Sequence, residues 1–310
     1  MDQQAAYRAA REMPEGAQIL YAEFAEKGSD YPCTYEPDVV YADYEGLKRS
    51  VQIIAPVRNG YTFPLVVFVQ GSAWRPQNVY AALPNLSRIA AKGYVMASVE
   101  IRDTDVARYP AALEDIKCAI RFMRSHAEKY GIDPRRVAVW GDSSGGHLSL
   151  MTGFTPGEHA NGLYPDQSDD VCAVVDYYGV TDILTLGQYN DILDHNAADA
   201  PEGLLLGGPV QERQELARQA SPLHQNLDRP LPPCLIVHGD RDSVVHVSQS
   251  IELYKALKEH GQQVWFYKVA GAEHGPGVWS PQVLDVTERF LAAFLHAPVM
   301  ERTPFQHEQE

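Results

Sequence analysis

The sequence contains no long apolar run and few cysteines. No stretch of about 18 consecutive apolar residues occurs, so we expect no helix that spans a bilayer. The cysteines include no CxxC pair, so no thiol-based metal or redox motif is predicted. The four of them are Cys33, Cys118, Cys172 and Cys234. We expect reduced thiols, of which the last three lie in apolar patterns typical of a buried core.

Positive charge is also scarce. The chain has 26 Lys and Arg against 41 Asp and Glu, which gives a net charge of -15 and a pI near 5.1. Nucleic acids and anionic membranes both attract positively charged surfaces, so neither is expected as a partner. Residues 1–20 carry acidic side chains and no uninterrupted apolar core. This pattern predicts no secretory signal and therefore a cytoplasmic protein.

The length and the composition are ordinary for a globular protein. The 310 residues are 45% hydrophobic and 22% charged, which suits one large α/β domain. We expect an N-terminal extension over residues 1–37, the domain over residues 38–297 and a tail over residues 298–310. Residues 181–222 are rich in Asp, Gly, Asn and Pro. A long segment of this kind inside a compact domain predicts a cap over the functional site.

Eight segments show strand patterns. Residues 38–56 alternate and predict an antiparallel hairpin that turns at Glu45-Gly46. The other six expected strands cover residues 65–69, 94–101, 137–140, 171–178, 234–237 and 263–269. Helical patterns lie between many of them, at residues 80–91, from 110, from 147, at 250–259 and at 283–295. This alternation predicts an eight-stranded, mostly parallel sheet with helices on both faces.

The segment Val137–Leu150, VAVWGDSSGGHLSL, has the pattern strand, sharp turn, helix. Ser143 lies between Gly141 and Gly145, as in the GxSxG nucleophile elbow. Glycine is needed there either for a positive φ or because a Cβ would collide with neighbouring backbone. Ser143 is therefore the candidate nucleophile. The N–H of Ser144 at the start of the following helix would favour negative charge on a developing oxyanion.

A serine nucleophile needs a base and a group that orients the base. Of the 11 histidines, His238 and His274 lie near the ends of predicted strands. His274 is favoured because it lies in a loop bounded by glycines, whereas His238 is expected to contribute to the turn after its strand. Asp242 and Asp240 compete as the orienting carboxylate.

Three other aspartates, Asp142, Asp176 and Asp182, are expected to be structural. The required chain order is Ser, then Asp, then His.

Together these segments resemble the α/β-hydrolase superfamily. The resemblance covers residues 38–296 and rests on the pieces FVQGSAW, RYPAALEDIKCAIRFMRSHAEKYGIDPRRVAVWGDSSGGH, VDYYGVTD, ASPLH, LIVHGDRDSVV and GAEHG. Within the superfamily they are similar to small carboxylesterases that act on acetylated or feruloylated plant glycans, including bifunctional feruloyl and acetylxylan esterases of gut bacteria. The resemblance favours Asp242 over Asp240.

The segment Gln70–Trp74 resembles the HGGGW-type loop of esterases, which supplies an oxyanion N–H. It implies that Ser72 and Ala73 are donors and that Trp74 forms a wall of the substrate pocket, or else belongs to the core. The sequence departs from the family pattern at Gln70, Ser72 and Ala73, and at Ser144, where alanine is frequent.

Two further residues are candidates for the pocket. Tyr178 could stack on an aromatic acyl group, although tyrosines near strands commonly serve packing. His246 stands where a proline is usual after the Asp loop, and a solvated loop histidine is the alternative reading.

The resemblance implies a serine esterase with a small-molecule ester substrate and no cofactor or metal. An arylformamidase or small peptidase would use the same three side chains on an amide. A ligand-binding, non-catalytic hydrolase homologue is the rival from another class. A homodimer is one assembly that the sequence leaves open.

Overall fold

The computed structural model describes residues 30–57, 60–188 and 192–296. The chain divides into two units, residues 1–30 and residues 31–310. Of the first unit only Asp30 is described. Most of the N-terminal extension expected over residues 1–37, and the expected tail over residues 298–310, therefore lie outside the described residues.

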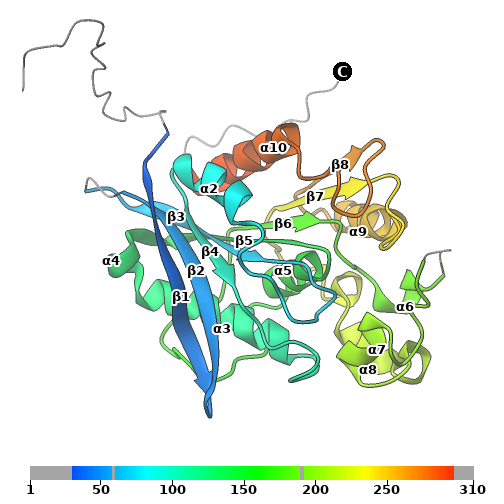
Figure 1. Cartoon of the computed structure of the whole chain (residues 1–310). Helices are drawn as coiled ribbons and strands as arrows, with labels where there is room; N and C mark the ends of the chain where they lie inside the picture. Colours follow the sequence, from blue (N-terminus) through cyan, green and yellow to red (C-terminus); the bar gives the residue numbers. More distant parts are fainter. Residues whose placement is uncertain (1–29, 58–59, 189–191, 297–310) are drawn as a thin grey trace, which may run out of the picture. The chain divides into compact units, whose positions relative to one another are not determined.

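The second unit is built on an eight-stranded sheet (Figure 1). Its strands are β1 (Cys33–Tyr44), β2 (Leu47–Pro56), β3 (Phe63–Val69), β4 (Val95–Val99), β5 (Ile132–Asp142), β6 (Ala173–Tyr177), β7 (Cys234–Gly239) and β8 (Val264–Val269). Their order in the sheet is β1-β2-β4-β3-β5-β6-β7-β8. The β1–β2 and β2–β4 pairs are antiparallel, and every other pair is parallel. The prediction of an eight-stranded, mostly parallel sheet is confirmed.

Helices cover both faces of the sheet (Figure 1). Those of the α/β core are α2 (Leu83–Ala91), α3 (Ala111–Ser125), α4 (Ala127–Tyr130), α5 (Ser144–Phe154), α9 (Ser248–Glu259) and α10 (Pro281–Leu291), which continues as the π-helical turn η3 (Ala292–His296). The segment predicted as a cap contains α6 (Ile183–Leu186), α7 (Pro201–Leu206), η1 (Val210–Glu212) and α8 (Gln214–Gln219). The short turn η2 (Pro222–His224) follows.

The apolar core lies on both sides of the sheet because successive side chains of a strand point to opposite faces. In β3, Leu65 and Val67 pack in the cluster that includes α3, α5 and α9, whereas Val66 and Phe68 pack in the cluster that includes α2 and α10. All seven residues of β3 are buried. A central parallel strand that is covered on both faces therefore reads as a continuous apolar run.

Some boundaries differ from the prediction. β1 begins at Cys33, five positions before the expected start at residue 38. Helix α2 begins at Leu83 and not at residue 80, because Pro84 lies in its first turn, where proline favours the start of a helix. The hairpin turn at Glu45-Gly46 lies where it was predicted.

The described residues include all four cysteines, and no disulfide joins them. Cys118 and Cys234 are buried, as expected. Cys172 is only half-buried, contrary to the expectation of a core thiol, and its Sγ lies 3.1 Å from the carbonyl oxygen of Arg135. Over the ranges that the structure describes, none of the helices combines the length and apolar character needed to cross a membrane.

Candidate active site

Ser143 lies at the sharp turn between β5 and α5. Its φ of 52° is in the left-handed region, which is unfavourable for a residue with a Cβ. The flanking glycines allow neighbouring backbone to approach the turn closely. A Cβ on Gly145 would lie 1.9 Å from the carbonyl oxygen of Val69, and one on Gly141 would lie 2.2 Å from that of Gly145. Of the two reasons for glycine considered from the sequence, steric space is the one that applies.

The structure brings Ser143, His274 and Asp242 into one hydrogen-bonded series. Ser143 Oγ lies 2.9 Å from His274 Nε2, and His274 Nδ1 lies 2.7 Å from Asp242 Oδ2. The three side chains follow β5, β8 and β7, whose carboxyl ends meet at one edge of the parallel sheet. This is the arrangement in which an imidazole can accept a serine proton while a carboxylate fixes its tautomer.

Asp242 is held from several sides. Its Oδ1 accepts the backbone N–H groups of Val244 and Val245, both at 2.9 Å. Its Oδ2 lies 3.2 Å from His238 Nε2 in addition to its contact with His274. Burial alone would raise the pKa of Asp242, but hydrogen bonds with the two imidazoles outweigh burial and hold this pKa well below its usual range. Asp242 is therefore ionised at neutral pH.

The competing candidates lie elsewhere in the same loops. Asp240 is exposed and accepts the N–H of Gly271 at 2.7 Å, so it ties two turns together. His238 is fully buried, with Nε2 2.8 Å from the carbonyl oxygen of Val245 and Nδ1 2.7 Å from Ser250 Oγ. His238 thus contributes to the turn after its strand, as the sequence suggested.

The three aspartates expected to be structural have structural contacts. Asp142 accepts the N–H of Gly71 at 2.8 Å and so joins the elbow to the loop after β3. Asp176 accepts the N–H of Gly179 at 2.9 Å, and Asp182 caps α6 by accepting the N–H of Leu184 at 3.0 Å.

The loop after β3 lies against the start of α5. The N–H of Ser72 donates to Ser144 Oγ at 2.9 Å, so a predicted oxyanion donor is engaged by the hydroxyl that replaces the family alanine. Ala73 and Trp74 have φ values of 56° and 55°. Both residues therefore adopt a conformation that is costly for a side chain with a Cβ, and glycine would relieve this cost at position 73.

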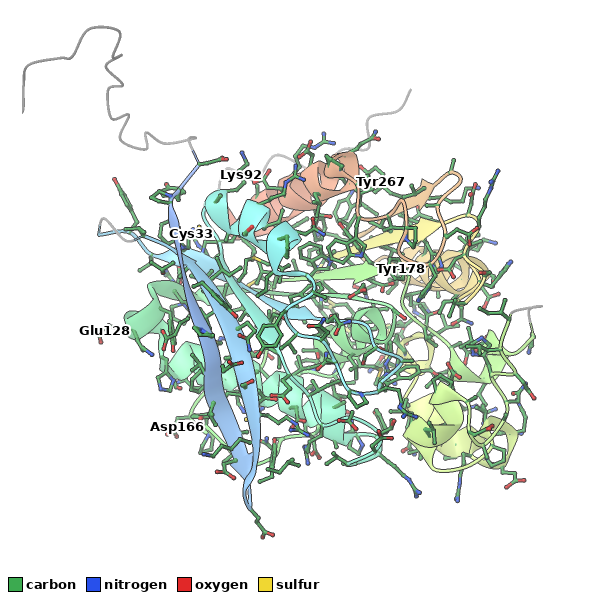
Figure 2. The ribbon with its side chains drawn as sticks, viewed as in Figure 1. Cys33, Lys92, Glu128, Asp166, Tyr178 and Tyr267 are labelled. Carbon is green, nitrogen blue, oxygen red and sulfur yellow. The ribbon has the colours of Figure 1, made fainter. Side chains whose placement is uncertain are left out.

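The predicted pocket residues differ in their exposure. Trp74 and Tyr178 are each 2% exposed, so both rings belong mainly to the interior. The ring of Tyr178, labelled in Figure 2 at the end of β6, packs 4.8 Å from that of His274, and its hydroxyl donates to Asp142 Oδ2 at 3.2 Å. His246 is half-buried, and its Nδ1 lies 3.0 Å from Ser248 Oγ. Pocket contact by these three residues stays a prediction.

His147 is a residue of the site region to which the sequence assigned no role. Its Nδ1 accepts the indole N–H of Trp74 at 3.1 Å, and its Nε2 lies 2.6 Å from the carbonyl oxygen of Ala220. Because an indole only donates and a carbonyl only accepts, the proton is on Nε2 and the imidazole is neutral. Burial lowers the pKa of His147 to about 4. Its position one turn after the nucleophile was the available signal.

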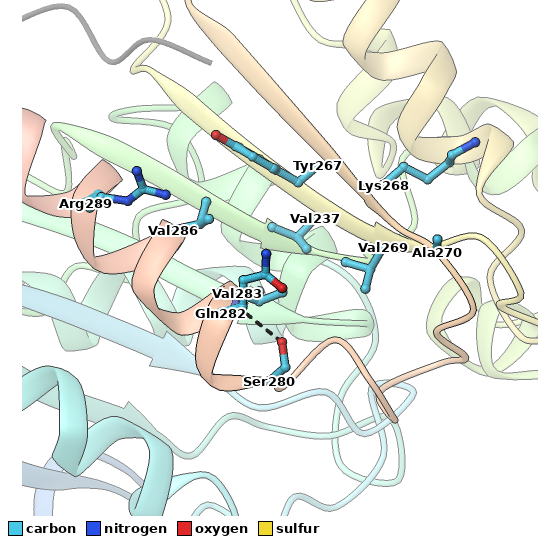
Figure 3. A pocket seen from close by; sticks show the side chains of 10 residues that line it. All are labelled: Val237, Tyr267, Lys268, Val269, Ala270, Ser280, Gln282, Val283, Val286 and Arg289. Atoms are coloured by element: carbon cyan, nitrogen blue, oxygen red, sulfur yellow. Dashed lines mark hydrogen bonds between the residues drawn. The ribbon is translucent and has the colours of Figure 1, made fainter. Parts of the chain in front are cut away.

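A separate hollow of about 490 Å³ lies between β8 and α10 (Figure 3). Tyr267 and Val269 line it from the strand, and Val283, Val286 and Arg289 line it from the helix. The lining includes none of the three side chains of the hydrogen-bonded series. In the part of the chain that the structure describes, no three His, Cys, Asp or Glu side chains are grouped so that they could hold a metal ion.

Comparison with known proteins places this geometry in a family. The BD-FAE family model matches residues 51–257, which is more than half of the chain. Esterase LipC of Mycobacterium tuberculosis is 33% identical over 255 residues, which cover 79% of this chain and 61% of LipC. The chain spans about half to three fifths of the length of the curated relatives LipC, LipM and LipQ.

Two solved structures show the same architecture. A truncated carbohydrate esterase from gut microbiota superposes with a TM-score of 0.77 at 29% identity, covering 88% of this chain and 99% of that one. A bifunctional GH43-CE protein of Bacteroides eggerthii gives a TM-score of 0.76 at 29% identity, covering 87% of this chain and 36% of that one. With its elbow, its sheet and the family match over residues 51–257, this chain belongs to the BD-FAE family of α/β-hydrolase esterases.

Proposed function

We propose that the chain is a serine carboxylesterase in which Ser143 is the nucleophile, His274 the general base and acid, and Asp242 the orienting carboxylate. The observation that carries the proposal is the continuous series from Ser143 Oγ through both nitrogens of His274 to Asp242 Oδ2, at 2.9 and 2.7 Å. This geometry occurs in a chain whose curated relatives are named as esterases.

In the first half of the reaction, Ser143 Oγ attacks the ester carbonyl carbon while His274 Nε2 takes the hydroxyl proton. The ionised Asp242 stabilises the imidazolium that results. Nε2 then gives the proton to the alcohol oxygen as the carbon–oxygen bond of the ester breaks. The alcohol leaves, and the acyl group stays on Ser143.

The negatively charged oxygen of the tetrahedral intermediate needs hydrogen-bond donors. The N–H of Ser144 at the start of α5 and the N–H of Ala73 are the donors that we assign, because the N–H of Ser72 already bonds to Ser144 Oγ. Ser72 becomes a third donor if the Ser144 hydroxyl rotates away. In the second half of the reaction, water replaces the serine hydroxyl as nucleophile and releases the acid.

For the substrate we propose short acyl or hydroxycinnamoyl esters, such as feruloyl esters, on plant-derived saccharides. The support comes from the two solved relatives at 29% identity, which are a carbohydrate esterase from gut microbiota and a bifunctional GH43-CE protein. The ring of Tyr178 lies beside His274 and would contact the acyl group of the substrate if the neighbouring side chains move apart.

We further propose that residues 181–222 cap the site and that residues 38–297 form one domain. Contacts support the cap, because Ala220 bonds to His147 and His195 bonds to the loop of Asp242. A cytoplasmic location is supported by four cysteines that form no disulfide.

The test compares the purified wild type with Ser143→Ala on p-nitrophenyl acetate, butyrate and octanoate, methyl ferulate, acetylated xylooligosaccharide and N-formylkynurenine. We expect the wild type to turn over acetyl or feruloyl esters and the variant to lose at least about 10³-fold in kcat, because the acyl-enzyme cannot form. Mass spectrometry of the wild type after a short reaction should show the acyl group on Ser143.

Each of the other outcomes would indicate a different function for the chain. Faster turnover of N-formylkynurenine than of every ester would make the chain an amidase. Equal rates for wild type and variant on all substrates would refute hydrolysis by Ser143. Retained ligand binding without turnover in the wild type would instead support a non-catalytic homologue.

A further inference from the structure

A second carboxylate–imidazole pair lies inside the predicted cap segment. His195 Nδ1 is 3.1 Å from Glu202 Oε2, and both side chains are buried, at 2% and 3% exposure. The other nitrogen of the ring, Nε2, lies 3.1 Å from the carbonyl oxygen of Val244. Val244 belongs to the loop that follows Asp242, so the pair connects α7 to the candidate active site.

The carbonyl of Val244 fixes one proton of His195. A carbonyl oxygen can only accept, so Nε2 must carry a hydrogen to bond to Val244. Nδ1, on the other side of the ring, lies 3.1 Å from Glu202 Oε2 without the geometry of a hydrogen bond. The carboxylate therefore packs against the side of the ring that faces away from Val244.

The contact reaches Asp242 through one peptide group. The carbonyl of Val244 and the N–H of Val245 belong to the same planar peptide unit. Its oxygen accepts from His195, and its N–H donates to Asp242 Oδ1 at 2.9 Å. A donor on the oxygen side polarises the peptide and strengthens the N–H as a donor. It also holds the peptide plane in the orientation that Asp242 requires.

We propose that His195 is a positioning residue for Asp242. Through its Nε2–H it holds the Val244–Val245 peptide so that the N–H of that peptide fixes the Asp242 carboxylate, and through it His274 and Ser143. The cap segment thereby takes part in setting the geometry of the active site. This inference rests on the proposed esterase function.

The test compares four variants with the wild type on p-nitrophenyl acetate: His195→Gln, His195→Asn, His195→Leu and the control His224→Leu. A glutamine amide reaches about as far as Nε2 and can still donate to Val244, whereas an asparagine amide stops near Nδ1 and leucine has no donor. His224 also contacts a carboxylate, 3.1 Å from Asp182 Oδ1, and among the described residues its side chain makes no hydrogen bond to the loop of Asp242. Each protein is also measured for thermal unfolding.

We expect His195→Leu and His195→Asn to lower kcat about tenfold with KM changed less than twofold, which corresponds to the loss of one buried hydrogen bond. His195→Gln should recover most of kcat, and His224→Leu should stay within twofold of the wild type. In the two deficient variants the acid limb of the kcat/KM profile should move to higher pH. An Asp242 with one weaker hydrogen bond is more basic and stabilises protonated His274 more strongly.

The outcomes separate the two proposals. A wild type without ester turnover overturns the esterase function itself. An active wild type with equal kcat and an equal acid limb in His195→Asn overturns the positioning role alone. So does a loss of kcat that is the same in His195→Gln and His195→Asn and follows thermal stability. If His195→Leu does not fold, the comparison between glutamine and asparagine still decides.

Discussion

Ala73 carries a conformational cost that glycine would not. Its φ of 56° lies in the left-handed region, where a Cβ approaches the following carbonyl oxygen. Trp74 shares this conformation, so the cost is concentrated in a loop that holds a proposed oxyanion donor. Local strain at a functional site is tolerated when the surrounding contacts fix the backbone. In this loop the bond from the Ser72 N–H to Ser144 Oγ is one such contact.

Ala73→Gly should therefore stabilise the protein. The relief of left-handed strain exceeds the extra entropy of glycine in the unfolded chain, and we expect a gain of about 0.5–1 kcal/mol in the free energy of unfolding. Urea denaturation at pH 7 measures the gain. The control is Ala119→Gly, at a fully buried position within α3, which should lose at least about 1 kcal/mol. A loss at both positions would contradict the assignment of strain to Ala73.

At the scale of single residues, the sequence could predict those that belong to spaced motifs. Ser143 is marked by its two glycines, and His274 by a glycine-bounded loop after a strand. The choice of Asp242 over Asp240 needed the family resemblance, because both carboxylates follow the same turn. His195 and Glu202 could not be found in this way. They lie in a segment without periodicity, and only folding brings His195 to the Val244 carbonyl and Glu202 to His195.

Helix α5 is joined to two other parts of the structure by His147. The imidazole bonds to Trp74 in the loop after β3 and to the carbonyl of Ala220 at the end of α8. The helix that begins at the nucleophile, the oxyanion loop and the cap segment therefore share one buried side chain. Within the described residues, neither the indole N–H of Trp74 nor the carbonyl oxygen of Ala220 has another hydrogen-bond partner.

His147→Phe should lower both stability and activity. Phenylalanine keeps a flat ring but leaves the Trp74 N–H and the Ala220 carbonyl unsatisfied, so we expect a loss of about 2–4 kcal/mol in the free energy of unfolding. Equilibrium urea unfolding gives the value. His260→Phe, at a side chain that is 40% exposed, should change it by less than about 0.5 kcal/mol. An unchanged kcat in folded His147→Phe would argue against a role of this helix contact in the oxyanion loop.

At the scale of elements, the order and the type of the strands and core helices followed from the sequence, whereas their ends did not. The expected elbow strand covered residues 137–140, but β5 extends from Ile132 to Asp142. Its outer residues include Pro134 and charged side chains, which carry no apolar signal. The pairing with β3 joins Phe63 to Ile132 and then Leu65 to Val137, so residues 133–136 form an irregular part of the strand between two paired positions. Pairing between distant segments is absent from any local pattern.

At the scale of the whole molecule, two buried groups couple stability to pH in opposite directions. Burial raises the pKa of Asp176 to about 7 and lowers that of His147 to about 4. Between pH 3.8 and 7 the folded chain keeps a proton on Asp176 that the unfolded chain has lost, so rising pH destabilises the fold. Between pH 4 and 6.5 the unfolded chain carries a proton on His147 that the folded chain does not, so rising pH stabilises the fold.

Removing the titration of Asp176 isolates its own contribution to the pH dependence of stability. Asp176→Asn keeps the acceptor for Gly179 but cannot titrate. Relative to the wild type, its free energy of unfolding should rise between pH 4 and pH 8 by an amount on the order of 3–4 kcal/mol and then stay constant. Urea unfolding at five pH values provides the curve. For Asp228→Asn, whose side chain is 85% exposed, the difference from the wild type should stay constant within about 0.5 kcal/mol. A flat difference for Asp176→Asn would contradict the raised pKa.

The strand order is a property of the whole molecule that could not be predicted from the sequence. The local patterns predict eight strands and their mostly parallel arrangement. They do not indicate that β4 lies between β2 and β3, which depends on how the helices pack on both faces. The local patterns and the family resemblance predicted the fold class, and the structure shows the strand order.

The hydrogen-bonded series has a consequence for how folding can be followed. Ser143 and His274 are 131 positions apart, and Asp242 and His274 are 32 apart. Their contacts exist only when β5, β7 and β8 lie in register, and such distant pairings are expected late in folding because they require the closure of long loops. A serine-reactive probe such as a fluorophosphonate would therefore count only molecules that have completed the sheet. The labelling yield, followed over time during refolding, would therefore measure the rate of the last step of folding.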